Sequence, residues 1–382
     1  MVPEGWKATQ VGDVATFSSG GTPSKQTAGY WGGSEPWISG KDLKSHYLRE
    51  SIDTLTAEGF AIAKKAPMGA SLILVRGMTL LKDFPVGYAS REMAFNQDIK
   101  ALVPKSHVDG LFLSFLLVAQ KNRIRQLVST AGHGTGRLDT SLVKGYPINL
   151  PPHPEQKKIA QILSTWDQAI TATEHLLENS QQRKKGLMQQ LLNGKKRLPG
   201  FEEEWEDGHL KDIAAISKGK ALSSKDLEDG VFPVVAGGKT SPYTHKTYTH
   251  DHAITVSASG AYAGYVAYHE YKFWASDCSV VEASEESNIE FLYHLMTWNQ
   301  QRIYALQSGG AQPHVYPKDL HAIRVLIPSK KEQQAIANIL TTASKETEQL
   351  QNRVNRLKQE KKALMQQLLT GKRRVNADTE AA

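Results

Sequence analysis

PEQKKIAQILSTW begins at Pro154, and a related stretch, KEQQAIANILTTA, begins at Lys331. Glu155 corresponds to Glu332 at an offset of 177 residues, and the same offset places LMQQLL at 187–192 on LMQQLL at 364–369 without a gap. Self-similarity at a fixed offset indicates a duplicated structural unit. The chain is therefore predicted to carry the same segment twice.

Both copies of this segment have the spacing of a coiled coil. Mostly apolar or small residues recur at alternating steps of four and three, at 159, 163, 166, 170, 173, 177, 180, 184, 187 and 191, and again 177 residues later. This heptad pattern predicts two helices, each ended by a glycine, Gly194 or Gly371, and a basic run. An isolated seam is more often a structural hairpin or a homodimer contact, but two copies in one chain can pack on each other.

A weaker repeat precedes each helical segment. Trp6 and the stretch 11–20 match Trp205 and the stretch 210–219 at an offset of 199 residues. The predicted order is a variable segment at 1–153, a helical segment at 154–197, a second variable segment at 198–329, a second helical segment at 330–374, and a tail at 375–382.

The variable segments are predicted to mix short strands with helices, which gives an α+β fold class. Strands are expected at 71–75, 146–150, 253–256 and 323–327, where β-like runs lie between turn residues. Helices are expected at 111–128 and 289–306.

The net charge of +7 is unevenly distributed along the 382 residues. The balance is +5 over 1–153, +4 over 154–197, −7 over 198–329, +7 over 330–374 and −2 over the tail. A basic balance favours a polyanionic partner. Cys278 is the only cysteine, no signal-like apolar core opens the chain, and no apolar run could span a bilayer. A cytoplasmic protein without disulfides is expected.

Several catalytic signatures are missing from the sequence. It contains no P-loop motif and no Asn/Asp-Pro-Pro-aromatic motif, so neither an ATPase nor an adenine methyltransferase site is predicted. The spacing of His245, His250, His252 and Cys278 fits no standard zinc site, and no metal is predicted. The GHGTG stretch at 132–136 is interpreted as a turn. We expect a non-catalytic chain.

Loops that interleave aromatic, small polar and basic residues suit DNA binding, because such side chains can bind base edges and phosphates. Any one of them could instead be structural. In the first variable segment the candidates are Thr22, Lys25, Tyr30, Ser39, Lys41, Arg76, Arg91, Asn96, Gln97 and Arg137. In the second they are Lys218, Lys220, Lys239, Ser259, Tyr262, Lys272, Gln312 and His314.

From residue 1 to about 375, the chain resembles the specificity (S) subunit of type I restriction–modification systems. The motifs that carry the resemblance are GGTPSKQTAGYWGGSEPWISGKDL at 20–43, AFNQDI at 94–99, PEQKKIAQILSTWD at 154–167, RKKGLMQQLLNGKKRLPGF at 183–201, AQPHVYPKDL at 311–320, and KEQQAIANIL with KALMQQLLTGKRR in the last segment.

The resemblance implies two target-recognition domains in inverted orientation, each reading one half of a bipartite double-stranded DNA site. It also implies that the helices form an antiparallel coiled coil, which sets the spacing and docks two modification (methyltransferase) subunits. Candidate partner-binding residues are Met188, Gln189, Gln190, Met365, Gln366 and Gln367. The chain itself is expected to hold no cofactor. S-adenosylmethionine, ATP and Mg would belong to the partner subunits, including restriction subunits where present.

Three alternatives remain open at this point. The chain could be the specificity subunit of another methyltransferase-based defence system, a coiled-coil protein-interaction adaptor or, least favoured, a stand-alone enzyme. The acidic second variable segment departs from the expected basic balance, so its DNA affinity would depend on Lys218, Lys220, Lys239 and Lys272.

Overall fold

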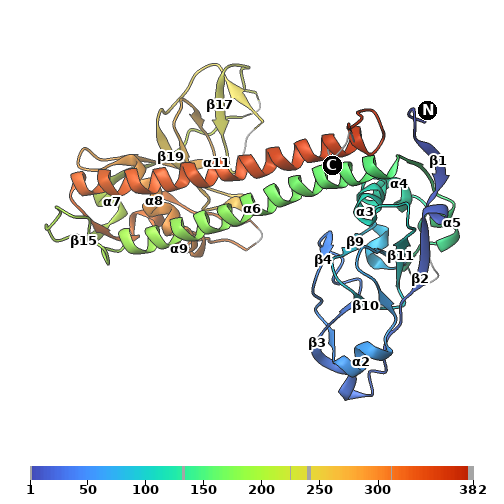
Figure 1. Ribbon diagram of the computed structural model, residues 1–382. Helices are drawn as coiled ribbons and strands as arrows, with labels where there is room; N and C mark the ends of the chain where they lie inside the picture. Colours follow the sequence, from blue (N-terminus) through green and yellow to red (C-terminus); the bar gives the residue numbers. More distant parts are fainter. Residues whose placement is uncertain (1, 131–133, 224, 239–241, 311, 377–382) are drawn as a thin grey trace. The chain divides into compact units, whose positions relative to one another are not determined.

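The computed structural model describes residues 2–130, 134–223, 225–238, 242–310 and 312–376 (Figure 1). The chain divides into two compact units, one comprising Met1–Ala172 with Val354–Ala382 and the other Thr173–Arg353. Each unit thus combines one variable segment with the beginning of one long helix and the end of the other. None of the described helices is long and apolar enough to cross a membrane.

The two long helices are α6, His153–Leu191, and α11, Lys330–Leu368, with 39 residues each. Every position of the predicted heptad seam is buried or half-buried in both helices, which confirms the spacing argument. Asp167 pairs with Lys361 in the first unit, and Ser180 pairs with Thr347 in the second. The partner number falls as the position along α6 rises, so the helices run antiparallel, as an intramolecular coiled coil.

A five-stranded sheet in the order β2-β11-β7-β9-β4 forms the centre of the first unit. Its strands are β2 (Ala15–Ser19), β11 (Ile99–Pro104), β7 (Ser71–Leu74), β9 (Val86–Ala89) and β4 (Tyr47–Leu48). The helix α3 (Gly110–Ala119) contacts β7, β9 and β11, and buries Phe112, Phe115 and Leu116 against them.

Smaller sheets surround this centre. A four-stranded sheet holds β5 (Thr54–Leu55), β3 (Trp31–Ile38), β10 (Met93–Phe95) and β6 (Lys65–Ala66); a three-stranded sheet holds β12 (Ser129–Thr130), β13 (Gly136–Arg137) and β8 (Arg76–Gly77); and β1 (Lys7–Gln10) pairs with β14 (Pro147–Leu150). The remaining short helices are α1 (Val11–Val14), η1 (Ala28–Tyr30), α2 (Ala57–Ile62), η2 (Met78–Leu81), α4 (Lys121–Arg125) and α5 (Thr140–Lys144).

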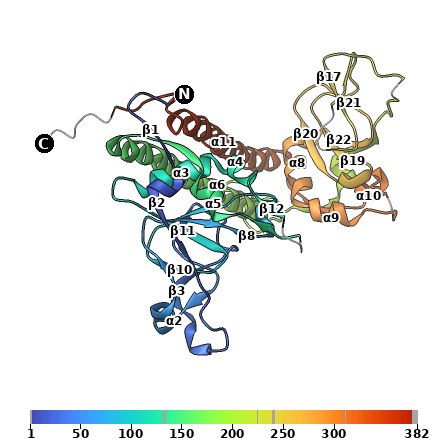
Figure 2. The same cartoon turned by 90° about the vertical axis from the view of Figure 1, so that its right-hand side faces the viewer.

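The second unit repeats this plan with fewer strands. Its central sheet has the order β16-β22-β19-β20, made of Ala214–Lys218, Cys278–Ala283, Ala253–Ser257 and Val266–His269. The small sheet of β18 (Thr244–His245), β17 (Phe232–Val235) and β21 (Trp274–Ala275) is visible in Figure 2, and β15 (Glu206–His209) pairs with β23 (Arg324–Ile327). The helices are α7 (Leu210–Ile213), η3 (Gly260–Tyr262), α8 (Ile289–Trp298), α9 (Gln300–Ala305) and α10 (Pro317–His321).

All four predicted strands are present, as β7, β14, β19 and β23, but each of the two predicted helices is broken. The first divides into α3 and α4 at Gln120, and the second into α8 and α9 at Asn299. Both residues have ψ near zero, at 1° and 10°. The Asn299 side-chain amide also donates to the Leu295 carbonyl at 2.9 Å, beside the backbone N–H of the same residue at 3.0 Å, so a side chain joins the helical hydrogen bonding there.

Buried glutamates close each unit. Trp6 Nε1 donates to Glu155 at 3.1 Å, and Trp205 Nε1 donates to Glu332 at 2.8 Å. Glu155 and Glu332, in the first turns of α6 and α11, are only 3% and 1% exposed. Each therefore ties a tryptophan from the start of a variable segment to the start of a long helix.

Candidate nucleic-acid interface

Strand ends converge at one edge of the first unit. Gly21 N–H donates to the Phe95 carbonyl, Asn96 N–H to the Ile38 carbonyl and Val75 N–H to the Asp98 carbonyl, at 2.8–2.9 Å. These bonds join the ends of β2, β3, β7 and β10 to the start of β11. We call the predicted site residues gathered here the first reading edge; they are Thr22, Ser39, Lys41, Arg76, Asn96, Gln97 and Arg137.

Two of these residues are buried and position the loops. Ser39, 8% exposed, donates through Oγ to Asp42 at 2.9 Å. Asn96, 9% exposed, accepts the Asp98 N–H through Oδ1 at 3.1 Å. Their side chains are engaged within the chain, so the exposed members of the edge are the ones available to DNA.

The exposed members include two arginines directly opposite each other. Arg137 on β13 is the register partner of Arg76 on β8, and both side chains are exposed. Neither forms an ion pair with the residues that the structure describes. Like charges opposite each other in a ladder are destabilising, so the pair favours an acceptor between or above the two guanidinium groups. Arginine forks fit phosphates and the O6/N7 edge of guanine.

Thr22 and Gln97 are exposed members of the same edge. Thr22 Oγ1 donates to Gln97 Oε1 at 2.6 Å. That bond leaves the Gln97 amide N–H groups without a hydrogen-bond partner among the described residues, and the side chain is exposed. Gln97 therefore offers the donors that a base edge or a phosphate accepts.

The remaining predicted residues of the first variable segment lie around β3 rather than at the edge. Lys25 Nζ is 5.9 Å from the centre of the Trp31 ring, and Arg91 pairs with Glu35 at 2.6 Å. Tyr30 is half-buried, and its carbonyl accepts the Thr56 N–H. Arg91 is thus already neutralised by a carboxylate.

The second unit forms a corresponding edge. Gly219 N–H donates to the Cys278 carbonyl, Ser276 N–H to the Val235 carbonyl and Ala258 N–H to the Asp277 carbonyl, at 2.8–3.1 Å. The second reading edge that results contains Lys218, Lys220, Ser259, Asp277 and His314. Ser259 and His314 form an antiparallel β-bridge, and the Ser259 hydroxyl donates a hydrogen bond to the Asp277 carboxylate. Lys220 Nζ lies 5.3 Å from the Trp274 ring centre.

The other predicted residues of the second variable segment are more scattered. Tyr262 is 45% exposed on η3, and Gln312 is exposed two residues before His314. Lys272 Nζ is 4.7 Å from the Tyr248 ring centre, near the small sheet. Lys239 lies outside the described residues.

The two edges occupy the same place in the fold but differ chemically. Leu138 and Val315 make equivalent bonds, to the carbonyls of Val75 and Ala258. Arg76 and Arg137 therefore correspond to Ser259 and His314. Asp277, whose carbonyl accepts the Ala258 N–H as the Asp98 carbonyl accepts the Val75 N–H, occupies the position of Asp98 and was not predicted; the match of NQDI at 96–99 to ASDC at 275–278 could have revealed it. The two edges therefore share this aspartate and differ at the paired positions, with Arg76 and Arg137 in one and Ser259 and His314 in the other.

The histidines considered for zinc have other partners. His245 packs on Trp274 with ring centres 4.3 Å apart, and His250 stacks on Phe273. Within the described ranges, no three His, Cys, Asp or Glu side chains are grouped as metal ligands. Burial raises the pKa of the Cys278 thiol to about 12, because the apolar surroundings disfavour the thiolate.

The predicted partner-binding residues differ in accessibility. Met188 is 7% exposed and packs into the core of the second unit, while Met365 is half-buried against the core of the first. The exposed members are Gln189, Gln190, Gln366 and Gln367. Of these six residues, the four glutamines therefore offer the most surface to another protein, Met365 offers part of its side chain, and Met188 offers almost none.

Comparisons with known proteins agree with this architecture. A family model described as the type I restriction modification DNA specificity domain matches residues 3–180 and 202–359. The chain is 25% identical over 414 residues to the type I restriction enzyme MjaVIII specificity subunit of Methanocaldococcus jannaschii, which covers 98% of this chain and 94% of that protein. It is 32% identical over 178 residues to the MjaIX specificity subunit of the same organism, covering 44% of this chain and 39% of that protein.

A solved structure shares the fold. The crystal structure of a type I restriction–modification S subunit from M. genitalium superposes with a TM-score of 0.71 at 18% identity, over 97% of this chain and 99% of that one. The family match covers both variable segments and most of both long helices. The chain belongs to the type I restriction–modification specificity subunit family.

Proposed function

We propose that each unit of this specificity subunit reads one half of a bipartite double-stranded DNA site, through its own reading edge. The observation that supports this most strongly is that two edges with the same backbone plan carry different side chains. Arg76 and Arg137 stand where Ser259 and His314 stand in the other unit. A duplicated protein that bound two identical sequences would have no need for that difference.

Catalysis belongs to partner subunits in this proposal. The chain acts in the cytoplasm with two modification subunits, and with restriction subunits where they are present. S-adenosylmethionine, ATP and Mg are used by those partners. The specificity subunit positions the DNA for them and itself contributes no reacting group.

The coiled coil has two roles in the proposal. α6 and α11, each about 58 Å long at 1.5 Å per residue, set the separation between the two half-sites. Their exposed glutamines, Gln189, Gln190, Gln366 and Gln367, contact the modification subunits. Replacing these four by Glu adds charge to an exposed surface, so complex formation should weaken while thermal unfolding stays unchanged. Unchanged co-purification would contradict the docking role.

The division of labour is tested with purified proteins. The chain alone should transfer no methyl group from S-adenosylmethionine to DNA, and addition of the modification subunit should start methylation of adenines within one sequence motif. Methyl transfer by the pure chain would contradict the proposal. If the chain and the modification subunit together methylated adenines without a sequence preference, that result would contradict the proposal as well.

A further inference from the structure

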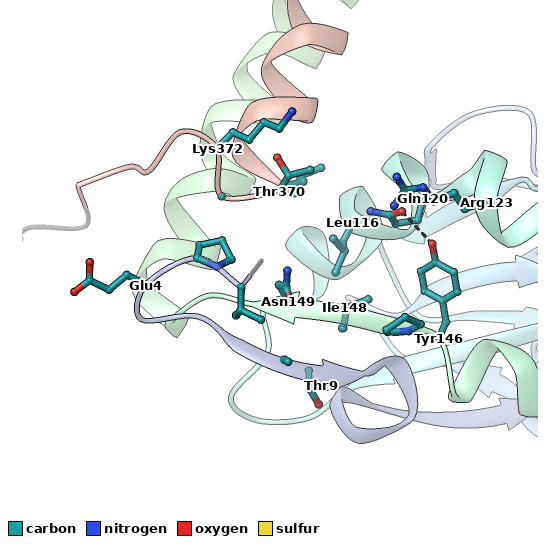
Figure 3. Close-up of a pocket in the computed structure, with 16 residues that line it drawn as sticks. Glu4, Thr9, Leu116, Gln120, Arg123, Tyr146, Ile148, Asn149, Thr370 and Lys372 are labelled. Carbon is teal, nitrogen blue, oxygen red and sulfur yellow. Dashed lines mark hydrogen bonds between the residues drawn. The ribbon is translucent and has the colours of Figure 1, made fainter.

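A groove of about 740 Å³ opens in the first unit, away from the reading edge (Figure 3). One wall is the β1–β14 pair, and another is the junction of α3 and α4. The third wall is the stretch that follows the end of α11. Leu116, Ile148 and Leu369 line it with apolar surface, and Gln120 and Arg123 add polar groups.

A second groove, of about 550 Å³, opens in the second unit. Its walls are the β15–β23 pair, the junction of α8 and α9, and the residues that follow the end of α6. Leu295, Val325 and Leu192 line it, with Asn299 and Arg302. Trp298, 36% exposed, and Leu326, 37% exposed, add accessible apolar surface.

The second groove is a copy of the first. Nine lining positions coincide at the offsets that relate the two halves: 199 for β1, 179 for the helix junction, and 177 for β14 and the helix ends. The six pairs that keep their chemistry are Leu116/Leu295, Gln120/Asn299, Arg123/Arg302, Ile148/Val325, Leu369/Leu192 and Thr370/Asn193.

The corresponding side chains of the two grooves are therefore largely alike, whereas those of the two reading edges are not. At the reading edges the corresponding side chains differ, as Arg76 and Arg137 differ from Ser259 and His314. In the grooves six of the nine coinciding positions keep their chemistry, while Ala8, Pro147 and Asn149 are replaced by Asp207, Arg324 and Leu326. A surface that differs between the copies suits two different ligands, whereas a surface kept in both copies suits one ligand bound twice.

The arginine that the two grooves share indicates the chemistry of that ligand; the other charged lining residues, Glu4 and Lys372 in one groove and Asp207 and Arg324 in the other, are not shared. Arg123 contacts the Tyr146 hydroxyl, and Arg302 Nη1 donates to Asn299 Oδ1 at 3.3 Å. Both arginines are exposed, and neither forms an ion pair with a described carboxylate. An arginine above an apolar floor fits a segment that inserts an apolar side chain and carries a carboxylate beside it.

The position of the grooves separates them from the bases. The first groove lies beside β1, ahead of the start of β2, whereas the reading edge follows the end of β2. The five residues of β2 span about 17 Å at ~3.4 Å per residue. A ligand in the groove thus leaves the reading edge free for DNA.

We propose that the two grooves bind the same segment, an apolar side chain next to a carboxylate, in two copies of the modification subunit. This proposal rests on the proposed function. The grooves would be docking sites in addition to the exposed glutamines of the helices. Each groove would bind one modification subunit, so two grooves would account for two bound subunits.

Charge reversal in each groove tests the proposal by stoichiometry. Arg123→Glu, Arg302→Glu and the double variant would be co-expressed with the modification subunit, and the complexes weighed by native mass spectrometry. Each single variant should carry one modification subunit instead of two, because only one groove is impaired. The double variant should carry none, with at least a tenfold loss of affinity.

A matched control makes the same charge change outside the grooves. Arg125 is exposed on α4, two residues from Arg123, and does not line the groove. Arg125→Glu should keep two modification subunits, and all variants should unfold at the temperature of the unmodified chain. Loss of subunits in the Arg125→Glu control equal to that in Arg123→Glu would overturn the assignment to the groove.

A double variant that still binds two modification subunits would also overturn the proposal. If that variant bound DNA more weakly as well, the grooves would take phosphates instead. In either case the unmodified chain would still direct methylation, so the proposed function would stand without the grooves. An unmodified chain that bound no modification subunit would instead refute both.

Discussion

Arg374, beyond the end of α11, holds Glu155 in the first turn of α6 by two hydrogen bonds of 2.7 and 2.8 Å, across 219 residues of sequence. Arg197, beyond the end of α6, holds Glu332 in the first turn of α11 in the same way, at 2.9 and 2.8 Å. Each unit is therefore closed by the end of the helix that began in the other unit. The duplication seen in the sequence is therefore also present in the arginine–glutamate pairs that join the end of one long helix to the start of the other.

Removing one of these carboxylates should destabilise its unit. Glu155→Ala removes the acceptor of the Trp6 N–H, a buried donor whose loss of a partner costs about 1–3 kcal/mol. Denaturant unfolding would measure the change. Glu346→Ala is the matched control, because its ion pair with Arg183 is exposed on both sides and such pairs contribute about 1 kcal/mol or less. Equal effects of the two changes would contradict the structural role of Glu155.

Acid should destabilise the protein through buried histidines. The pKa values of His46, His269 and His294 fall from 6.5 to about 4, mainly because of burial, with a smaller contribution from Lys361 for His46 and from Lys184 for His294. Since the unfolded chain takes up these protons at higher pH than the folded chain, stability falls as the pH drops from 6.5 towards 4. Each group contributes at most about 3 kcal/mol over that window.

One histidine can be replaced by its counterpart from the other unit. His294 corresponds to Phe115, an apolar aromatic residue that is fully buried on α3. His294→Phe should therefore fold, and its melting temperature should fall less between pH 7 and pH 4.5 than that of the unmodified chain. An identical pH profile for the two proteins would show that His294 does not contribute.

The opposed arginines of the first reading edge should affect one half-site only. Arg76→Ala and Arg137→Ala should each cost about 1–3 kcal/mol of binding if the guanidinium group contacts a base, with relaxed preference at that position. Arg91→Ala is the control, because Arg91 is paired with Glu35 away from the edge. Binding would be measured with the assembled complex on DNA with substitutions in either half. Relaxation of both halves together would contradict independent reading.

Helix length should set the spacing between the half-sites. Seven residues inserted in each helix, near Thr173 and Leu350, preserve the heptad seam and add about 10 Å. At ~3.4 Å per base pair the preferred spacer should grow by about three base pairs. Affinity should fall even at the new optimum, since three base pairs turn DNA by about 100° and the supercoil compensates little of it. An unchanged optimal spacer in a folded, assembled variant would contradict this role.

The sequence predicts local periodicity well and long-range contacts poorly. The seam from Ile159 to Leu191 is visible because each position lies one turn from the next, and burial confirms it. The break at Gln120 is invisible, because hydrophobic residues continue on both sides of it. Met188 lies within a Gln-rich run, yet it packs into a core whose residues are spread along the chain from Leu191 to Leu340.

The candidate sites show the same contrast. Arg76 and Arg137 could each be singled out as basic loop residues, but their opposition depends on pairing between β8 and β13, 61 positions apart. Ser39 and Asn96 have side chains typical of base contacts, yet burial commits them to holding loops. The grooves are built from four distant segments each, and only the structure brings those together.

The central claim, that the two units read two different half-sites, is tested most directly by mapping methylated adenines. Genomic DNA would be sequenced from cells carrying the modification subunit with the unmodified chain, with no chain, and with the Arg76→Ala, Arg137→Ala double variant. The account predicts one bipartite methylated motif, its loss without the chain, and relaxation of a single half in the double variant. Methylation unchanged without the chain, or a variant that altered both halves equally, would contradict it.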